Sequence, residues 1–283
     1  MAESDKPLQI DVDSVLRSRT PGLRRFLPRF AVRWLERLIC QPQMNEFLAR
    51  YGHLRDAEFC RALVDYLDIT YTVDGDVDSL DDKRVIVACN HPLGGLDGMI
   101  LIELFTRLFG TDVKFLVNNL LMAVEPLRGV FLPVNKYGHQ SRDAARQVDE
   151  AFSGDAPVLI FPAGLCSRKS AGGVIADLEW QKTFINKAVK YHRDIIPVHF
   201  SGQNSRFFYN FAKFRKRVGI KFNIEMVRLP REVFLSRGKS FVVTIGAPVS
   251  WQSLKGGADA AQEALDIRRR VYSLAPEVKV ADN

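Results

Sequence analysis

Short apolar runs alternate with amphipathic stretches over most of the chain beyond Lys83. The runs are rich in Val, Ile, Leu and Phe, as buried β-strands are. We expect strands at residues 84–89, 113–117, 129–134, 157–161, 195–200 and 240–245. Apolar positions at helical spacing predict helices at 98–109, 141–152, 178–191 and 258–272. This alternation predicts an α/β fold with a mixed, largely parallel sheet flanked by helices.

The segment before this pattern is amphipathic in a different way. Four arginines share one i, i+4 row, and three aromatic residues share the adjacent row: Arg25, Arg29, Arg33 and Arg37, and Phe26, Phe30 and Trp34. Such a helix suits a lipid interface, although a capping helix with solvated arginines has the same pattern. A second helix, at about residues 57–67, is expected to pair with it. The candidate membrane-binding residues are Arg25, Arg29, Phe30, Arg33, Trp34 and Arg37.

These patterns divide the chain into four parts. Residues 1–20 are polar and are expected to be flexible, and residues 21–70 form the amphipathic helical, membrane-associating segment. Residues 75–275 hold the α/β domain, and residues 276–283 form a tail. A membrane-spanning helix needs about 20 mostly apolar residues, and the charge-free runs here are far shorter. We therefore expect a protein that lies on a membrane instead of crossing it.

Charge and cysteine content narrow the classes of partner. A net charge of +7 favours a polyanion, which could be nucleic acid, anionic lipid or an acidic carrier protein. The four cysteines are scattered without a C-x-x-C pair, so neither a zinc site nor a disulfide framework is indicated. They fit a reducing compartment, and the acidic first residues do not resemble a secretion signal.

The block Asn90–Gly98 carries the clearest candidate chemistry. It follows a predicted strand and leads into a predicted helix, and Pro92, Gly94 and Gly95 bend the chain between His91 and Asp97. A histidine whose second nitrogen meets a carboxylate can act as a general base near neutral pH. Taken alone, the pair could equally be a loop histidine and a helix N-cap.

Three further blocks follow along the chain. Phe161–Arg168 could cradle an anion or a carbonyl oxygen, although an ordinary turn has the same composition. Pro126–Pro133 places Arg128 at the start of a strand, and Ile195–Phe200 is a buried strand in which Pro197 indicates an irregularity. A G-x-S-x-G elbow and an H-E-x-x-H motif are absent from the sequence, so a serine hydrolase and a zinc hydrolase are disfavoured.

Together and in this order, the four blocks resemble the glycerolipid acyltransferase family, typified by the bacterial lysophosphatidic-acid acyltransferase. The resemblance covers about residues 75–250 and implies the glycerolipid acyltransferase fold. By this resemblance His91 and Asp97 are catalytic, and Pro197 shapes the acyl site. The implied acceptor-binding residues are Arg128, Gly164, Ser167 and Arg168. No metal or cofactor is implied, since the acyl thioester is a substrate.

Two departures from the family pattern point to one branch. This chain has five residues between His91 and Asp97, where the family usually has four, and Ala163 stands where a glutamate is usual. These blocks, with Glu179–Lys182 and Ser201–Ser205, look like the hemolysin-labelled branch that includes the O-acyltransferases of ornithine-lipid and glycine-lipid synthesis. The implied acceptor is an N-(3-hydroxyacyl) amino acid, and the implied donor is acyl carrier protein or acyl-CoA, the carrier protein being favoured.

The resemblance implies a peripheral enzyme on the cytoplasmic face of the bacterial inner membrane. A lysophospholipid acyltransferase is the alternative enzyme, and a membrane-lysing hemolysin is the alternative outside enzymes. The aromatic and basic stretch Arg206–Arg217 suits a headgroup layer. It could also bind single-stranded nucleic acid, but no accompanying recognition motif is present, so we expect no nucleic-acid partner.

Overall fold

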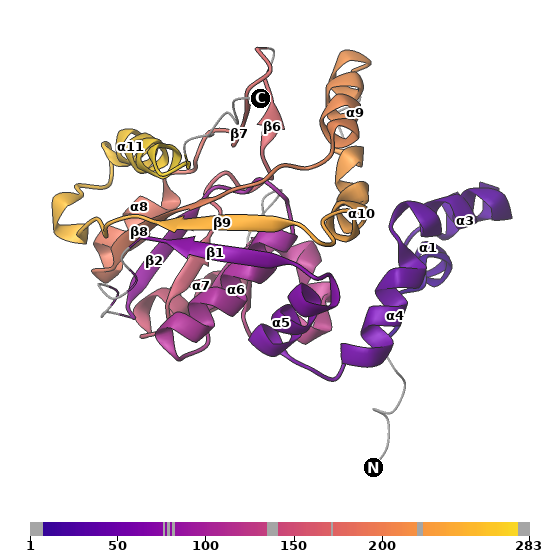
Figure 1. Cartoon of the computed structure of the whole chain (residues 1–283), viewed down its shortest axis with the longest axis horizontal. Coiled ribbons are helices and arrows are strands. Elements are labelled where there is room, and N and C mark those ends of the chain that lie inside the picture. The colour runs from indigo at the N-terminus through magenta and orange to yellow at the C-terminus, as the bar shows by residue number, and fades with distance from the viewer. Residues whose placement is uncertain are drawn as a thin grey trace, which may run out of the picture.

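The computed structural model describes residues 8–75, 77, 80, 83–134, 141–170, 172–219 and 223–276. A seven-stranded sheet lies at its centre, with helices on both faces (Figure 1). Its strands are β1 (Thr70–Asp74), β2 (Val85–Cys89), β3 (Lys114–Asn118), β4 (Phe131–Val134), β5 (Val158–Ile160), β8 (Asp194–Phe200) and β9 (Ser240–Ile245). A separate antiparallel pair consists of β6 (Arg168–Lys169) and β7 (Ile175–Ala176).

The helices follow the predicted alternation from residue 96 onward. The N-terminal helices are α1 (Val12–Arg19), α2 (Pro21–Phe26), α3 (Arg29–Leu38), α4 (Gln41–Tyr51) and α5 (Asp56–Tyr66). The others are α6 (Leu96–Phe109), α7 (Arg142–Ser153), α8 (Thr183–Tyr191), α9 (Arg206–Arg217), α10 (Leu229–Phe234) and α11 (Ala260–Ser273). Among the described helices, none combines the length and apolar character that crossing a membrane requires.

The sheet has the order β1-β9-β8-β2-β5-β3-β4. All neighbouring strands are parallel except β8 and β9, so the predicted mixed, largely parallel sheet is confirmed. Strand β2 lies between β8 and β5, and every residue of it is buried. A strand covered on both faces needs apolar side chains on both, which is why β2 reads as a continuous apolar run.

Two layers of helices complete the core. Helices α5 and α6 supply Phe59, Leu63, Ile100 and Phe105 to one face of the sheet. The other face is covered by α7, α8 and α11, with Phe152, Phe184 and Ile267 among its buried residues. Helix α6 is the most central of these helices because Leu96, Leu101 and Leu104 are also buried in it. It holds the loop that precedes it rigidly against the sheet.

The N-terminal segment differs from the prediction in two respects. Helix α5, expected to pair with the arginine-bearing helix, packs mainly on α6 instead. The single arginine row from Arg25 to Arg37 is interrupted, because α2 ends at Phe26 and α3 begins at Arg29. Leu27 between them is extended, with φ −83° and ψ 117°. A residue before proline is disfavoured in the helical region, and Pro28 has no N–H to donate. Arg25 therefore lies on a different helix from the other three arginines.

The boundaries of the α/β domain also differ from the predicted ones. Strand β1 begins at Thr70 and pairs with β9, so the sheet starts before residue 75. Residues 12–19, expected to be flexible, form α1, which Asp11 caps by accepting from the Ser14 N–H at 3.0 Å. The Asn45 side chain fixes this segment by two hydrogen bonds to the Ile10 backbone. Residues 1–7 and 277–283 lie outside the described residues.

Candidate active site

Three loops meet at one edge of the sheet. They follow β2 and the two strands parallel to it on either side, β5 and β8, so the carboxyl ends of the three strands lie at the same edge. The Asn90 side chain joins the first loop to the last strand, because it donates to the Phe200 carbonyl at 2.9 Å and accepts from the Phe200 N–H at 2.7 Å. Asn204 donates to the carbonyls of Pro92 and Leu93. This edge is where α/β proteins commonly place their ligands.

The structure brings the side chains of His91 and Asp97 together. Nδ1 of His91 lies 2.9 Å from Oδ2 of Asp97, although the two residues are six positions apart. The turn between them needs Gly94, whose φ of +81° is in the left-handed region that other residues rarely adopt. The extra residue between histidine and aspartate is accommodated in this turn and does not separate the pair.

Asp97 is fully buried at the first turn of α6. Its Oδ2 accepts from the N–H groups of Leu93 at 2.8 Å and Gly94 at 3.3 Å, and its Oδ1 from those of Gly95 and Gly98 at 3.0 Å each. Burial raises the pKa of this carboxyl, but the charge and hydrogen bond of His91 and the donated backbone N–H groups outweigh burial and leave the pKa below its usual value. Asp97 is therefore an ionised, immobile acceptor.

The imidazole of His91 is oriented by two contacts. Since the Asp97 carboxylate can only accept, Nδ1 carries the proton, and Nε2 keeps its lone pair. The ring stacks on Phe161, with ring centroids 3.8 Å apart and an angle of 19° between the planes. The His91 side chain is 14% exposed, so part of its ring reaches the surface. This arrangement can remove a proton from a hydroxyl group.

Asp177 was not among the predicted site residues, yet it holds the His91 backbone. Its two carboxylate oxygens lie 3.1 and 3.2 Å from the His91 N, which donates to them. It also accepts from Ser167 Oγ at 2.6 Å and from Trp180 Nε1 at 3.0 Å. Burial raises the pKa of Asp177, although these donors oppose the effect. No local pattern marks Asp177, and its position two residues before the Glu179–Lys182 block was the only signal in the sequence.

The loop after β5 is joined to the His91 loop by its backbone. The Ser167 N–H donates to the His91 carbonyl at 2.7 Å, and Ser167 itself is 2% exposed. Gly164 is exposed at the turn, with a φ of +62°, and its N–H donates to the Phe161 carbonyl at 2.9 Å. Ser167 thus holds the backbone of the His91 loop in place. The contact of Gly164 and Ser167 with an acceptor stays a prediction.

Arg168 forms a buried ion pair. Its Nη2 lies 3.0 Å from Oε1 of Glu225, and Arg215 Nε lies 2.8 Å from the other oxygen of the same carboxylate. Arg168 and Glu225 are 8% and 0% exposed, and Arg168 Nη1 donates to the Cys166 carbonyl. The Glu225 carboxylate is therefore shared by two guanidinium groups and already contacts Arg168. To bind an acceptor, the Arg168 guanidinium would have to contact Glu225 and the acceptor at the same time. Its role in acceptor binding stays a prediction.

Two other predicted residues lie apart from the pair. Arg128 precedes the amino end of β4, whereas His91 follows the carboxyl end of the parallel strand β2. Amino and carboxyl ends of parallel strands lie at opposite edges, and Arg128 Nε instead donates to the Met122 carbonyl. The structure thus does not bring Arg128 to the His91 loop. Pro197 is buried in β8 opposite Ala88, where pairing with β9 begins one residue later.

Known proteins match this chain along almost its whole length. A lyso-glycine lipid O-acyltransferase of Bacteroides thetaiotaomicron is 41% identical over 270 residues, which cover 95% of this chain and 99% of the relative. One of the same name from Phocaeicola vulgatus is 38% identical, with 95% and 96% covered. The structure of a 1-acyl-sn-glycerophosphate acyltransferase from Thermotoga maritima aligns with a TM-score of 0.46 and 17% identity, over 93% and 91% of the two chains.

A family model described as Acyltransferase matches residues 14–280. That span includes the sheet, the three loops at its carboxyl edge and helices α2 to α11. It also includes His91 and Asp97, the pair whose geometry suits the removal of a proton from a hydroxyl group. The chain belongs to this acyltransferase family and is an acyltransferase.

Proposed function

We propose that this enzyme esterifies the free hydroxyl of a lyso-glycine lipid, using His91 as the general base and Asp97 as its orienting partner. The observation that carries the proposal is the 2.9 Å contact between His91 Nδ1 and the buried, ionised Asp97. It leaves Nε2 as the only ring nitrogen free to accept a proton. The names of the two relatives, at 41% and 38% identity, support the choice of acceptor.

The reaction follows from this geometry. As His91 Nε2 takes the proton of the acceptor hydroxyl, the hydroxyl oxygen bonds to the thioester carbonyl carbon. The tetrahedral intermediate then collapses, the carbon–sulfur bond breaks, and the imidazolium returns its proton to the leaving thiolate. The Asp97 carboxylate stabilises the imidazolium between these two steps. The products are the ester and a free thiol, and the enzyme is regenerated without a covalent intermediate or a cofactor.

The donor in this proposal is an acyl thioester, carried by acyl carrier protein in preference to coenzyme A. The net charge of +7 suits an acidic carrier protein, and the phosphates of coenzyme A would be attracted as well, so the preference rests on the family resemblance. An N-(3-hydroxyacyl) ornithine would present the same secondary hydroxyl and carboxylate, so it is the nearest alternative acceptor. A lysophosphatidate acceptor would present a phosphate instead of a carboxylate.

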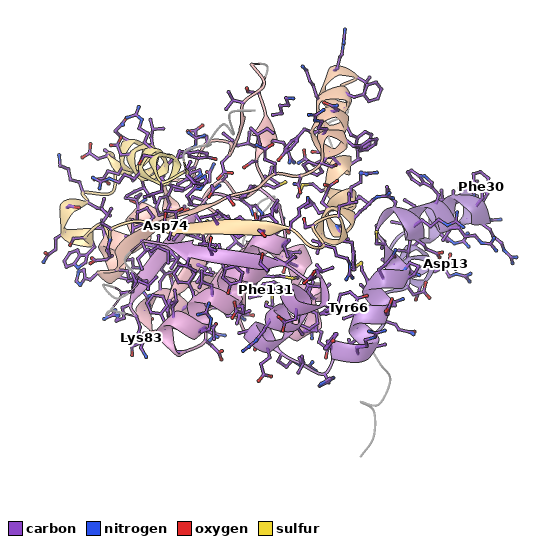
Figure 2. All side chains as sticks on the ribbon, viewed as in Figure 1. Asp13, Phe30, Tyr66, Asp74, Lys83 and Phe131 are labelled. Carbon is purple, nitrogen blue, oxygen red and sulfur yellow. The ribbon has the colours of Figure 1, made fainter. Side chains whose placement is uncertain are left out.

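The proposal places the reaction at a membrane surface, on the cytoplasmic face of the inner membrane. Phe26, Phe30 and Trp34 are 84%, 74% and 61% exposed, which is unusual for large apolar side chains. Figure 2 shows Phe30 at the far end of α3, away from the sheet. The exposed side chains of Arg25, Arg29, Arg33 and Arg37 alternate with these rings. Aromatic rings among arginines suit the boundary between lipid headgroups and acyl chains.

The test is an acyl-transfer assay with a panel of acceptors. Purified enzyme is incubated with a labelled acyl-carrier thioester and with lyso-glycine lipid, lyso-ornithine lipid and lysophosphatidate in separate reactions. We expect a labelled diacylated glycine lipid, identified by mass spectrometry, and its loss in His91→Ala. Label that appears only in phosphatidate would reject the aminolipid acceptor. Equal turnover with acyl-CoA would reject the preference for the carrier protein.

A further inference from the structure

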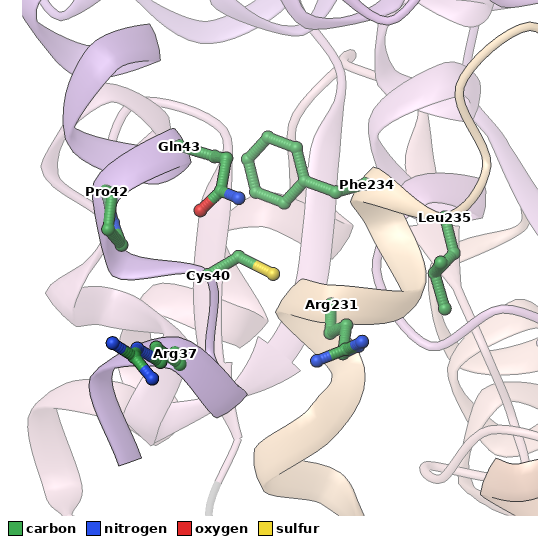
Figure 3. A pocket seen from close by; sticks show the side chains of 7 residues that line it. All are labelled: Arg37, Cys40, Pro42, Gln43, Arg231, Phe234 and Leu235. Carbon is green, nitrogen blue, oxygen red and sulfur yellow. The ribbon is translucent and has the colours of Figure 1, made fainter. Parts of the chain in front are cut away.

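A pocket lies where the N-terminal segment meets α10. Its volume is about 300 Å³, and Figure 3 shows it between the α3–α4 junction and α10. The lining residues are Arg37, Cys40, Pro42, Gln43, Arg231, Phe234 and Leu235. In Figure 3 the guanidinium groups of Arg37 and Arg231 lie below Cys40 in the view, and the Phe234 ring and the Gln43 amide lie above it. One side of the pocket is thus cationic, and the other combines apolar groups with the Gln43 amide.

The charge of the two arginines is not balanced locally. Within the described part of the chain, no carboxylate lies within 4.0 Å of a nitrogen of Arg37 or Arg231. The neighbouring Glu232 is 4% exposed and accepts from the N–H and hydroxyl of Ser205, so it is directed away from the pocket. Burial raises the pKa of the Cys40 thiol, while the charges of Arg231 and Arg228 oppose that effect. Arg37 and Arg231 thus line this pocket without a neighbouring carboxylate to pair with.

The surroundings of the pocket indicate a lipid. Arg37 belongs to the same helix as Phe30 and Trp34, which are 74% and 61% exposed, and Leu235 on the opposite wall is 47% exposed. A phospholipid presents an anionic phosphate attached to an apolar glycerol ester region. In the pocket, two arginines lie near the apolar side chains of Phe234 and Leu235. An acidic carrier protein would need a broad basic surface, because specific protein interfaces bury about 800 Å² per partner.

The pocket is distinct from the site where the acceptor reacts. The opposite face of α10 packs on the catalytic loop, since a Cβ placed on Gly94 would meet Leu229 at 2.9 Å and one placed on Gly95 would meet Val233 at 3.7 Å. An α-helix with its side chains is about 10–12 Å across. The hydroxyl and carboxylate of a lyso-glycine lipid are separated by six bonds, which span less than this width. The carboxylate of an acceptor therefore could not lie in the pocket while its hydroxyl reacts at His91.

We propose that this pocket binds the phosphate headgroup of an anionic membrane phospholipid, with Arg37 and Arg231 donating to the phosphate and Phe234 and Leu235 contacting the glycerol ester region. The inference rests on the proposed work at a membrane surface, but its test involves no acyl transfer. The proposal of a lipid site can therefore be disproved while the proposed reaction stands, and the reverse is also true.

The test is calorimetric titration with dihexanoyl phosphatidylglycerol below its micelle concentration, which separates pocket binding from adsorption to a surface. We expect one site in the wild-type protein. The Arg37→Gln, Arg231→Gln double variant should weaken binding by at least about tenfold, because two charge-assisted hydrogen bonds are lost. The matched control is Arg61→Gln, Arg270→Gln, which removes the same charge from exposed positions on α5 and α11 and should keep the wild-type affinity. Circular dichroism verifies the fold of each variant.

Several outcomes would overturn the inference. Equal weakening by the two double variants would show general attraction between charges, and no weakening by either would place the lipid elsewhere. Inorganic phosphate that binds as tightly as the lipid would show a simple anion site. Dihexanoyl phosphatidylcholine that binds equally would remove the role of net charge. If the pocket variant kept lipid binding but lost binding of acyl carrier protein, the pocket would belong to the carrier.

Discussion

His91 and Asp97 act through a single hydrogen bond, so their effects on rate should not add. General-base catalysis is typically worth about a hundredfold to ten-thousandfold. We expect His91→Ala to lower kcat by that range and Asp97→Asn to be nearly as severe, because an amide cannot stabilise the imidazolium. The double variant should be little worse than His91→Ala alone. Steady-state kinetics on folded variants measures this, and effects that multiply would contradict a shared role.

The two carboxylates beside His91 should be distinguishable by kinetics. Asp177 holds the His91 backbone, and Ser167 and Trp180 donate to the same carboxylate. In Asp177→Asn the new NH₂ group would face one of these donors, so the loop should shift. A displacement of about 1 Å can cost about a hundredfold in rate, and we expect kcat to fall while the acceptor KM changes little. Ser167→Ala removes only one donor and should cost less. An increase in KM at constant kcat would instead assign Asp177 to acceptor binding.

At the residue scale, local sequence could predict the catalytic pair but not its support. The sequence contains Pro92, Gly94 and Gly95, which predict a sharp bend. This bend brings His91 to Asp97. Asp177 is separated from His91 by 86 positions, so only the folded sheet brings them together. The surroundings of Arg168 were equally beyond local sequence. Its residue type suggested an anion site, which stays a prediction, but no pattern near Arg168 indicated its buried partner Glu225, 57 positions away.

At the element scale, the strands that sequence predicts best are those buried on both faces. All six predicted strands exist, with boundaries within two residues of the expected ones, because their apolar runs are continuous. Strand β1 was missed because most of its residues are exposed, which leaves no apolar pattern to detect. The predicted helix at 178–191 begins only at Thr183, because the residues before it form hydrogen bonds to Asp177 and to the loop after β5. Trp180 donates to Asp177, and the Gln181 N–H donates to the Pro162 carbonyl at 3.0 Å.

Helix α3 should be the principal membrane contact among the described elements. We predict that Phe30→Ser, Trp34→Ser lowers cosedimentation with anionic vesicles at least about tenfold, because each buried aromatic ring contributes about 1.5–3 kcal/mol. Both side chains are exposed, so the fold should be unaffected. Leu265→Ser, on the exposed side of α11, is the control and should bind as the wild-type protein does. Unchanged cosedimentation of the double variant at both low and high salt would exclude α3.

On the scale of the whole molecule, stability and chemistry are located at opposite edges of the sheet. Arg193 is fully buried just before the amino end of β8, whereas His91 follows the carboxyl end of the parallel strand β2. The Arg193 guanidinium donates to carbonyls of the α7 carboxyl end and of the neighbouring strands, among them those of Phe152 at 2.7 Å, Ala156 at 2.9 Å and Val85 at 3.2 Å. A cation is favourable there because the carboxyl end of a helix carries partial negative charge.

Arg193→Met should therefore destabilise the fold without changing the mechanism. It leaves several buried carbonyls without a donor, and hydrogen bonds to a charged group are worth about 1.5–3 kcal/mol each. We expect the free energy of unfolding in urea to fall by about 3 kcal/mol or more. Arg269→Met, at an exposed position of α11, should change it by no more than about 0.5 kcal/mol.

Well below its melting temperature, the folded Arg193→Met enzyme should keep a kcat close to the wild-type value, since the three loops around His91 are anchored at the other edge. A large loss of kcat in a fully folded variant would show that the two edges are coupled, and a wild-type stability would show that the buried cation is dispensable.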